Sequence, residues 1–282
     1  MCDLLVARPT TTDDGRTLFA KNSDRPPGEV QVVEFTEPRF EGHTRATHVS
    51  IPGHSSSTLR AVISRPSWGW GAEHGVNVAG VAIGNATIYT TLDPRDSPDA
   101  LTGMDLVRLG LERGHSADEA LSVITSSIER FGQGGSGHDP GSPRRPYWSS
   151  FLIVDATTAW VLETSGSTWM SHEVTDTWAL SNRVTLPEFD RHRHPRQPVE
   201  TLVDPRLEST RDFLSRRPVS MSGVADHLSS HGVTSDGWDV CMHADMQETT
   251  ASMIVALTPG REPEVLHLLG HPCRGNWDRL RW

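Results

Sequence analysis

Residues 1–7 read Met-Cys-Asp-Leu-Leu-Val-Ala, and residues 17–25 read Thr-Leu-Phe-Ala-Lys-Asn-Ser-Asp-Arg. Both runs begin as β-prone apolar segments, and an Asp-Asp-Gly turn at residues 13–15 separates them. They predict an antiparallel hairpin, which brings the polar end of the second strand beside the start of the first. We therefore expect the groups from Lys21 to Arg25 next to Cys2.

Cys2 directly follows the initiator methionine, which an aminopeptidase readily removes when the next side chain is small. Cys2 would then carry the free α-amine, whose pKa of about 7.7 to 8.0 makes it a competent base at neutral pH. Its thiol ionises at about 8.5, so one residue can supply both nucleophile and base. A nearby carboxylate would hold the ammonium, and a nearby cation would favour the thiolate. The alternative is an ordinary small buried cysteine.

The rest of the chain alternates between groups of strands and pairs of helices. Helical spacing is clearest over Thr102–Arg113 and in the segment that follows Ser116, where Ser116 and Glu119 match a capping box. The order predicts a single layered α+β domain over residues 1–282, with two mainly antiparallel sheets between helical layers. The expected strands are 4–7, 17–20, 30–35, 59–64, 76–83, 150–155, 159–163, 177–180, 250–257 and 264–268, with further helices at 209–216 and 220–230.

The composition is that of a globular protein of a size that one core can serve. The 282 residues carry a formal net charge of −10 without a basic block, which argues against nucleic-acid or anionic-membrane partners. No apolar run approaches the roughly 20 residues that span a bilayer, and the start lacks a signal peptide. Three widely spaced cysteines fit no disulfide framework, so we expect a cytoplasmic protein. The oligomeric state stays open, a homo-oligomer included.

Two histidine-containing stretches invite a metal site. His192–His194 and Cys241–His243 each offer a pair of ligands, but neither has a third and fourth ligand at recognisable spacing, so we expect no metal and no other cofactor. The Gly-, Pro- and Ser-rich loop 132–146 is either a lid or a disordered segment. The aromatic pair in Trp68–Trp70 fits a substrate pocket and core packing equally well.

Beyond these local features, the sequence resembles the secernins and the related bacterial dipeptidases over nearly its full length. Any one of the matching motifs is weak, whereas the whole set in this order is specific. The motifs are Cys2–Ala7, Phe19–Arg25, Trp70–Asn77, Gly80–Asn85, Leu101–Arg108, Trp160–Thr164, Leu180–Asn182, Cys241–His243 and Thr249–Met253.

The resemblance implies a four-layer αββα fold of the N-terminal nucleophile (Ntn) hydrolases and cysteine-dependent hydrolysis of small peptides or amides. By the broader pattern of bile-salt and penicillin acylases, Cys2 is the nucleophile. Lys21 matches the cation of that pattern, and Asp24 matches the carboxylate near the nucleophile. Asn85 matches the oxyanion-hole amide, and Asn182 matches a second amide that orients the substrate and the cysteine amine.

Substrate contacts are expected from Asn22 and Arg25 at the same strand end, and from Trp70. One departure affects specificity: secernin-like chains commonly have Glu after the Gly-Asn pair, and this chain has Ala86. A substrate contact made by that carboxylate, such as binding a peptide's free amino group, is therefore in doubt. The specificity is expected to differ from that of a plain dipeptidase.

One member of the wider catalytic pattern, a final arginine, has no clear match, and Arg211 and His243 are the two candidates. The function also has alternatives on the same fold. An amine could intercept the thioester, which would make the enzyme an acyltransferase. A non-catalytic regulatory or binding protein of the secernin type would leave Cys2 unused.

Overall fold

The computed structural model describes residues 1–195 and 199–282. Its first two strands, β1 (Cys2–Ala7) and β2 (Thr17–Arg25), form the predicted antiparallel hairpin. Cys2 pairs with Ser23, and the register continues to Ala7 opposite Leu18. The expected placement of the polar end of β2 beside Cys2 is therefore confirmed.

The hairpin belongs to the first of two large antiparallel sheets. Its strand order is β12 (Thr177–Leu180), β1, β2, β14 (Gln247–Leu257), β15 (Glu264–Leu269) and β16 (Asp278–Leu280), and the short β13 (His243–Ala244) pairs with β14. Because β1 and β2 are central, Cys2 starts an inner strand. On the β2 side Cys2 pairs with Ser23, whereas the pairing of β1 with β12 begins at Leu4.

The second sheet has the order β11 (Thr168–Glu173), β10 (Ala159–Ser165), β9 (Trp148–Val154), β8 (Ala82–Ile88), β7 (His74–Asn77), β6 (Ala61–Pro66) and β3 (Gln31–Thr36). A separate ribbon pairs β4 (His43–Arg45) with β5 (Ser50–Pro52). The single strand expected over 76–83 is wrong, because a turn splits it into β7 and β8. Gly80 in that turn has a φ of +85°, which a residue with a side chain rarely adopts.

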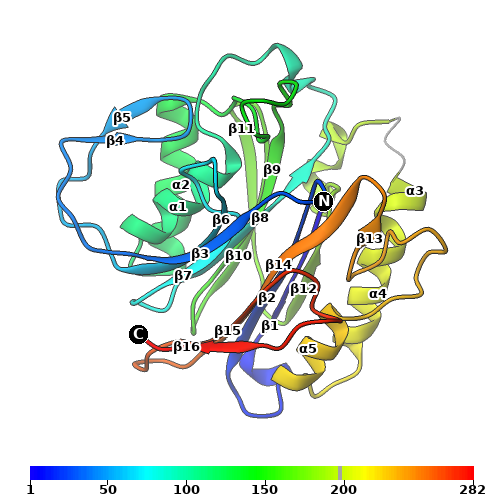
Figure 1. Cartoon of the computed structure of the whole chain (residues 1–282). Coiled ribbons are helices and arrows are strands. Elements are labelled where there is room, and N and C mark those ends of the chain that lie inside the picture. Colours follow the sequence, from blue (N-terminus) through cyan, green and yellow to red (C-terminus); the bar gives the residue numbers. More distant parts are fainter. Residues whose placement is uncertain (196–198) are drawn as a thin grey trace.

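Helices cover the outer face of each sheet (Figure 1). Helices α1 (Gly103–Arg113) and α2 (Ala117–Phe131) lie over the second sheet, and α4 (Asp204–Ser215) and α5 (Met221–Leu228) lie over the first. The short α3 (Val199–Leu202) precedes α4. Thr102 begins α1 with a capping box, since its hydroxyl accepts from Asp105 N while the Asp105 carboxylate accepts from Thr102 N. The predicted αββα layering is confirmed.

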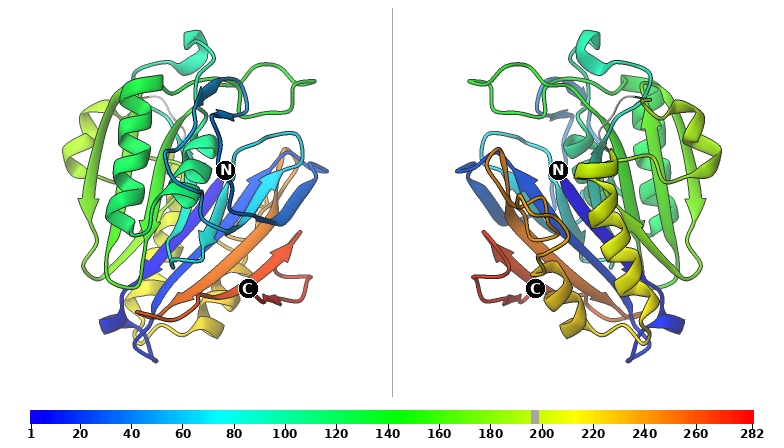
Figure 2. Two further views of the ribbon diagram at one scale, coloured as in Figure 1. Left: turned by 90° about the vertical axis from the view of Figure 1, so that its left-hand side faces the viewer. Right: turned by 90° about the vertical axis from the view of Figure 1, so that its right-hand side faces the viewer.

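Three apolar clusters fill the spaces between the four layers. One lies between the two sheets, one between the second sheet and α1 and α2, and one between the first sheet and α4 and α5. Single-turn 3-10 helices lie at Pro9–Thr11 between β1 and β2 and at Pro94–Asp96 between β8 and α1, and a longer one at Pro187–His192 lies between β12 and α3. Figure 2 shows the two sheets from the side, with the loops after β8 and α2 projecting beyond the N-terminus. None of the described helices is long and apolar enough to cross a membrane.

Candidate active site

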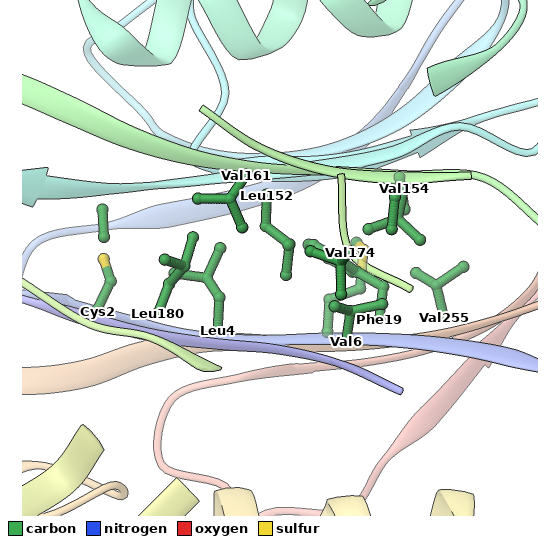
Figure 3. Packing of buried hydrophobic residues seen from close by; sticks show 14 of the residues in the cluster. Cys2, Leu4, Val6, Phe19, Leu152, Val154, Val161, Val174, Leu180 and Val255 are labelled. Atoms are coloured by element: carbon green, nitrogen blue, oxygen red, sulfur yellow. The ribbon is translucent and has the colours of Figure 1, made fainter. Parts of the chain in front are cut away.

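The Cys2 side chain lies at one end of the layer between the sheets. Side chains alternate along β1, so Cys2, Leu4 and Val6 share the inter-sheet cluster while Leu5 and Ala7 face the helices. Figure 3 shows the sulfur pointing from β1 toward the opposite sheet. The residue is only 8% exposed in the chain that still carries Met1.

The terminal amine is held by the polar end of β2. The Met1 amine donates to Asp24 O at 2.8 Å and to Gln247 Oε1 at 3.0 Å, and Asp24 N donates back to Met1 O at 2.9 Å. Burial lowers the pKa of this α-amine, an effect that the nearby Cys2 and Asp24 oppose. An amine in this position is thus shifted toward its neutral, basic form at pH 7.

The Asp24 carboxylate lies on the helix-facing side of β2. Its Oδ1 accepts from Thr249 Oγ1 at 2.7 Å, and its Oδ2 is buried with no hydrogen-bond partner among the described residues. Burial raises the Asp24 pKa to about 6, whereas the terminal amine opposes that rise. One carboxylate oxygen therefore makes no hydrogen bond within the described residues, although Arg206 lies 3.8 Å from it, and the pKa of the group is close to neutral pH.

Asn182 holds the backbone nitrogen of Cys2. Its Oδ1 accepts from Cys2 N at 2.9 Å and from Arg206 Nη2 at 3.1 Å, and its Nδ2 donates to Thr87 O at 2.9 Å. The segment just after Asn182 is in turn fixed by Glu163, whose carboxylate accepts from Thr185 N at 2.6 Å. The structure thus brings the predicted Asn182 and Asp24 to Cys2, from opposite sides of its strand.

A fully buried arginine that the sequence did not single out completes this group. Arg206 projects from α4, donates to Asp3 Oδ2 at 2.5 Å and has Asp24 Oδ2 at 3.8 Å. It balances two carboxylates that would otherwise be buried together. An arginine in an amphipathic helix normally faces water, so the residue type gives no sign of this burial. Only its position beside Leu207 on the apolar face of α4 indicates it.

Neither candidate for the final arginine lies in this group. Arg211 is exposed on α4 and pairs with Glu208. The imidazole of His243 lies between the two cysteines Cys241 and Cys273. The arginine that the structure does place beside Asp3, Asp24 and Asn182 is Arg206, five positions before Arg211 on the face of α4 that packs against β1. The role of a final arginine stays a prediction.

Lys21 lies on the same face of β2 as the Cys2 partner Ser23. Its side chain is fully buried and its Nζ donates to Ser23 Oγ at 2.9 Å, while that hydroxyl contacts His74 Nδ1 at 3.0 Å. Burial lowers the His74 pKa well below its ordinary value, and Lys21 adds to this effect. His74 is therefore neutral. Lys21, the predicted cation, lies in the inter-sheet layer with the Cys2 thiol.

Asn85 lies on the other face of its strand. Ala82, Ala86 and Ile88 belong to the inter-sheet cluster with Cys2, so the alternation turns Asn85 toward α1. There its Nδ2 contacts Ser149 Oγ at 3.5 Å. The structure does not bring this predicted oxyanion-hole amide to the thiol, and it places Ala86 on the face that Cys2 shares.

Two of the three expected substrate contacts are engaged elsewhere. Asn22 faces the helices, where its Nδ2 donates to Leu228 O and Val240 O at 2.9 and 2.8 Å. Trp70 packs beside α1, with the Arg108 guanidinium 4.5 Å from its ring centre. Both side chains make contacts within the chain and neither lines the cleft, so their role as substrate contacts stays a prediction.

The third, Arg25, lines a cleft of about 930 Å³ at the N-terminal end of β1. It is held by Glu29 at 2.6 Å and by Gly137 O at 2.8 Å. The loop 132–146 provides part of one wall through Gly137, His138 and residues 143–146. The other lining residues include Met1, Asp24, Thr87, Tyr89, Arg95, His138, Arg144, Arg145, Tyr147, Asn182, His194, Trp238 and Met246.

Outside this cleft, the structure gives the Cys241–His243 pair the two further ligands that the sequence spacing lacks. His231 and Cys273 approach the pair, and one ligand atom of each of the four residues lies within 4.8 Å of the others. The expectation that this stretch lacks a ligand set is corrected. The set could not be recognised by spacing because its members come from three separate segments.

The four-layer arrangement of two antiparallel sheets between helices matches the Ntn-hydrolase fold of solved enzymes. Penicillin V acylase from Agrobacterium tumefaciens is similar, with a TM-score of 0.60 and 13% identity over 95% of this chain and 83% of that one. The C2A mutant of conjugated bile acid hydrolase from Clostridium perfringens has a TM-score of 0.57 and 12% identity over 100% and 97% of the two chains.

A third similar structure is the Caenorhabditis elegans ortholog of N-acylethanolamine-hydrolyzing acid amidase, with a TM-score of 0.52 and 12% identity over 90% of this chain and 92% of that one. No family model matches the sequence. At these identities the likeness establishes the fold alone.

Proposed function

We propose that this protein is an N-terminal cysteine amidohydrolase that cleaves small peptides or amides after loss of Met1. The carrying observation is that Asn182 Oδ1 already accepts a hydrogen bond from Cys2 N at 2.9 Å. Removal of Met1 would convert that nitrogen into the terminal amine without moving it. Met1 also lines the cleft, so its loss would expose the largely buried Cys2 to substrate.

The surrounding groups suit an N-terminal base. Without Met1, the Asp24 backbone groups that now bind the Met1 amine and carbonyl would be free to hold substrate or water. Burial lowers the pKa of an amine at this end of the strand, and the Asp24 carboxylate limits that decrease and orients the ammonium. Lys21, on the thiol-bearing face, favours the thiolate.

The reaction begins when the Cys2 α-amine takes the thiol proton and Sγ attacks the substrate carbonyl carbon. The tetrahedral intermediate collapses, the carbon–nitrogen bond breaks, and the ammonium gives its proton to the leaving amine. The acyl group is then bound to Sγ as a thioester. A water molecule, deprotonated by the same amine, attacks the thioester carbonyl and releases the acid with the thiol restored.

The cleft favours a substrate that carries a carboxylate. Arginines 25, 95, 144 and 145 line it although the whole chain has a net charge of −10. Arg25 and Arg95 have carboxylate partners within the chain, whereas no carboxylate partner of Arg145 is found among the described residues. The carboxylate end of a small peptide would suit Arg145, with Tyr89 and Trp238 beside an apolar side chain.

Ala86 is relevant to the amino end of the substrate. It is buried in the cluster that contains Cys2, and an alanine there offers no carboxylate for a free amino group. We therefore propose that N-acylated small peptides or amino acids are cleaved at least as well as free dipeptides. Transfer to a second amine is the alternative outcome, since an amine that enters the cleft could replace water.

The decisive experiment combines the mass of the purified protein with thiol labelling. We expect active molecules to lack Met1 and to react with iodoacetamide fastest at Cys2 near pH 7, with parallel loss of hydrolysis over a panel of free and N-acylated dipeptides. Cys2→Ala is the control that should fold and be inactive. Retention of Met1 on every active molecule, or full activity after Cys2 is blocked, would refute the mechanism; an inert Cys2 with no hydrolysis would favour the binding-protein alternative.

A further inference from the structure

Four potential metal ligands meet at the end of the first sheet, far along the chain from the hairpin that carries Cys2. His231 follows α5, Cys241 precedes β13, His243 is the first residue of β13, and Cys273 follows β15. His243 Nε2 lies 3.5 Å from Cys241 Sγ and 3.2 Å from Cys273 Sγ. We call these four residues the cysteine–histidine cluster, since it contains two cysteines and two histidines.

The geometry of the cluster is that of a tetrahedral ion site. Zinc–sulfur bonds of about 2.3 Å and zinc–nitrogen bonds of about 2.0 to 2.1 Å place ligand atoms roughly 3.3 to 3.8 Å apart at the corners of a tetrahedron. The nitrogen–sulfur distances of 3.2 and 3.5 Å lie at or close to that range. All four ligand atoms lie within 4.8 Å of one another, so a small contraction around an ion would complete the site.

We propose that the cysteine–histidine cluster binds one Zn²⁺ as a structural site. Two thiolates and two imidazoles form a ligand set that selects zinc among the common divalent ions. Four protein ligands leave no open position for water, which distinguishes a structural zinc from a catalytic one. None of the four residues lines the cleft beside Asp24 and Asn182, so the ion takes no part in the proposed hydrolysis.

Neighbouring side chains support the orientation of one ligand. The His271 ring stacks on that of His243, with centres 4.1 Å apart and planes within 11°. His271 Nε2 in turn lies 3.4 Å from a carboxylate oxygen of Glu248. The stacked ring restrains the orientation of the His243 imidazole.

The ion would tie three segments to the strand that carries Asp24. Between two of the ligands, Met242 N donates to Thr249 Oγ1 at 2.9 Å, and that hydroxyl donates to Asp24 Oδ1 at 2.7 Å. Just before the ligands, Val240 O accepts from Asn22 of β2. Zinc would therefore hold the loop 229–242 and the segment after β15 against the candidate active site.

The test is the metal content of the full-length protein purified without chelators. We expect about one zinc per chain, reduced at least 10-fold in Cys273→Ser and His231→Asn and unchanged in His43→Asn, an exposed histidine of β4. Cys2→Ala should also keep its zinc, which separates this site from the proposed hydrolase chemistry. Folded wild-type protein without zinc, or equal zinc content in all variants, would overturn the proposal.

A second measurement covers ligand variants that fail to fold. Wild-type protein stripped with a chelator should lose thermal stability and regain it when ZnCl₂ is added but not when MgCl₂ is added. Zinc should also slow alkylation of Cys241 and Cys273, mapped by peptide mass. An unchanged melting temperature together with unprotected thiols would refute a zinc site. A disulfide between Cys241 and Cys273 in protein whose free thiols are alkylated directly in the cell extract would refute it too.

Discussion

Asn182 Oδ1 accepts a hydrogen bond from the backbone nitrogen of Cys2 at 2.9 Å, although 180 positions separate the two residues. The same oxygen accepts from Arg206, which binds Asp3, the residue after the cysteine. The start of β1 is thus held by an amide from the end of β12 and an arginine from α4. This arrangement fixes the nitrogen that is proposed to become the catalytic base.

Replacing this amide should affect catalysis more than replacing the other predicted one. Asn182→Ala removes the acceptor that holds the Cys2 amine, so we expect turnover to fall by about 100- to 1000-fold, the range for loss of one oriented catalytic hydrogen bond. Asn85→Ala is the matched control, because that side chain contacts Ser149 on the opposite face of β8. Steady-state kinetics with equal losses in both variants would place Asn85 back in the catalytic group.

The two arginines of α4 should differ strongly in their contribution to stability. Arg206→Met leaves Asp3 and Asp24 buried without their counter-charge, and removal of one partner from such a group costs about 3 to 5 kcal/mol. Arg211→Met removes an exposed pair and should change the free energy of unfolding by less than about 0.5 kcal/mol. Urea unfolding measures both, and similar values would argue against a central role for Arg206.

Asp24→Asn should impair catalysis while the fold survives. The carboxylate raises the pKa of the nearby amine, so its loss lowers that pKa and lets the amine stay neutral at lower pH. Burial also raises the pKa of Asp24 to about 6, and the variant has no such ionisable carboxyl. The acidic limb of the rate profile should therefore move to lower pH while the maximum rate falls by about 100-fold. Wild-type turnover with an unmoved acidic limb would rule out this role.

Glu163 should make stability depend on pH. Burial raises its pKa to about 7 from 4.5, so between these values the folded state binds more protons than the unfolded state. Stability from this group is therefore complete below pH 4.5 and is lost as pH rises through 7, by at most roughly 3 kcal/mol.

Glu163→Gln removes that titration and should flatten the decline of unfolding free energy between pH 4.5 and 7. Its Oε1 can still accept from Thr185 N and Thr185 Oγ1, whereas the weaker contact of Oε2 with Leu186 N is lost. Thermal unfolding across pH for both proteins provides the comparison. A decline of equal slope in the Gln variant would assign the pH dependence to other groups.

Local pattern alone was enough for the hairpin and the layers. Alternating apolar residues in β1 and β2, a short turn and the capping residues Thr102 and Ser116 act over a few positions, so sequence determines them. The sequence did not determine which side chains of β8 face the inter-sheet layer, because the turn at Gly80 decides where that strand begins. A shift of one position there turns Asn85 from one face of the sheet to the other.

The sequence by itself determined the α+β class, the hairpin that places Asp24 and Lys21 by Cys2, and the helices over residues 103–131. Only the tertiary structure decided that Arg206 is the buried counter-charge, that Asn22 and Trp70 lie outside the lining of the cleft, and that His231 and Cys273 join Cys241 and His243. The physical reason is range: hydrogen bonds within a turn or ladder depend on neighbouring residues. Burial of a charge and convergence of four ligands depend on how layers pack segments that lie tens to hundreds of residues apart.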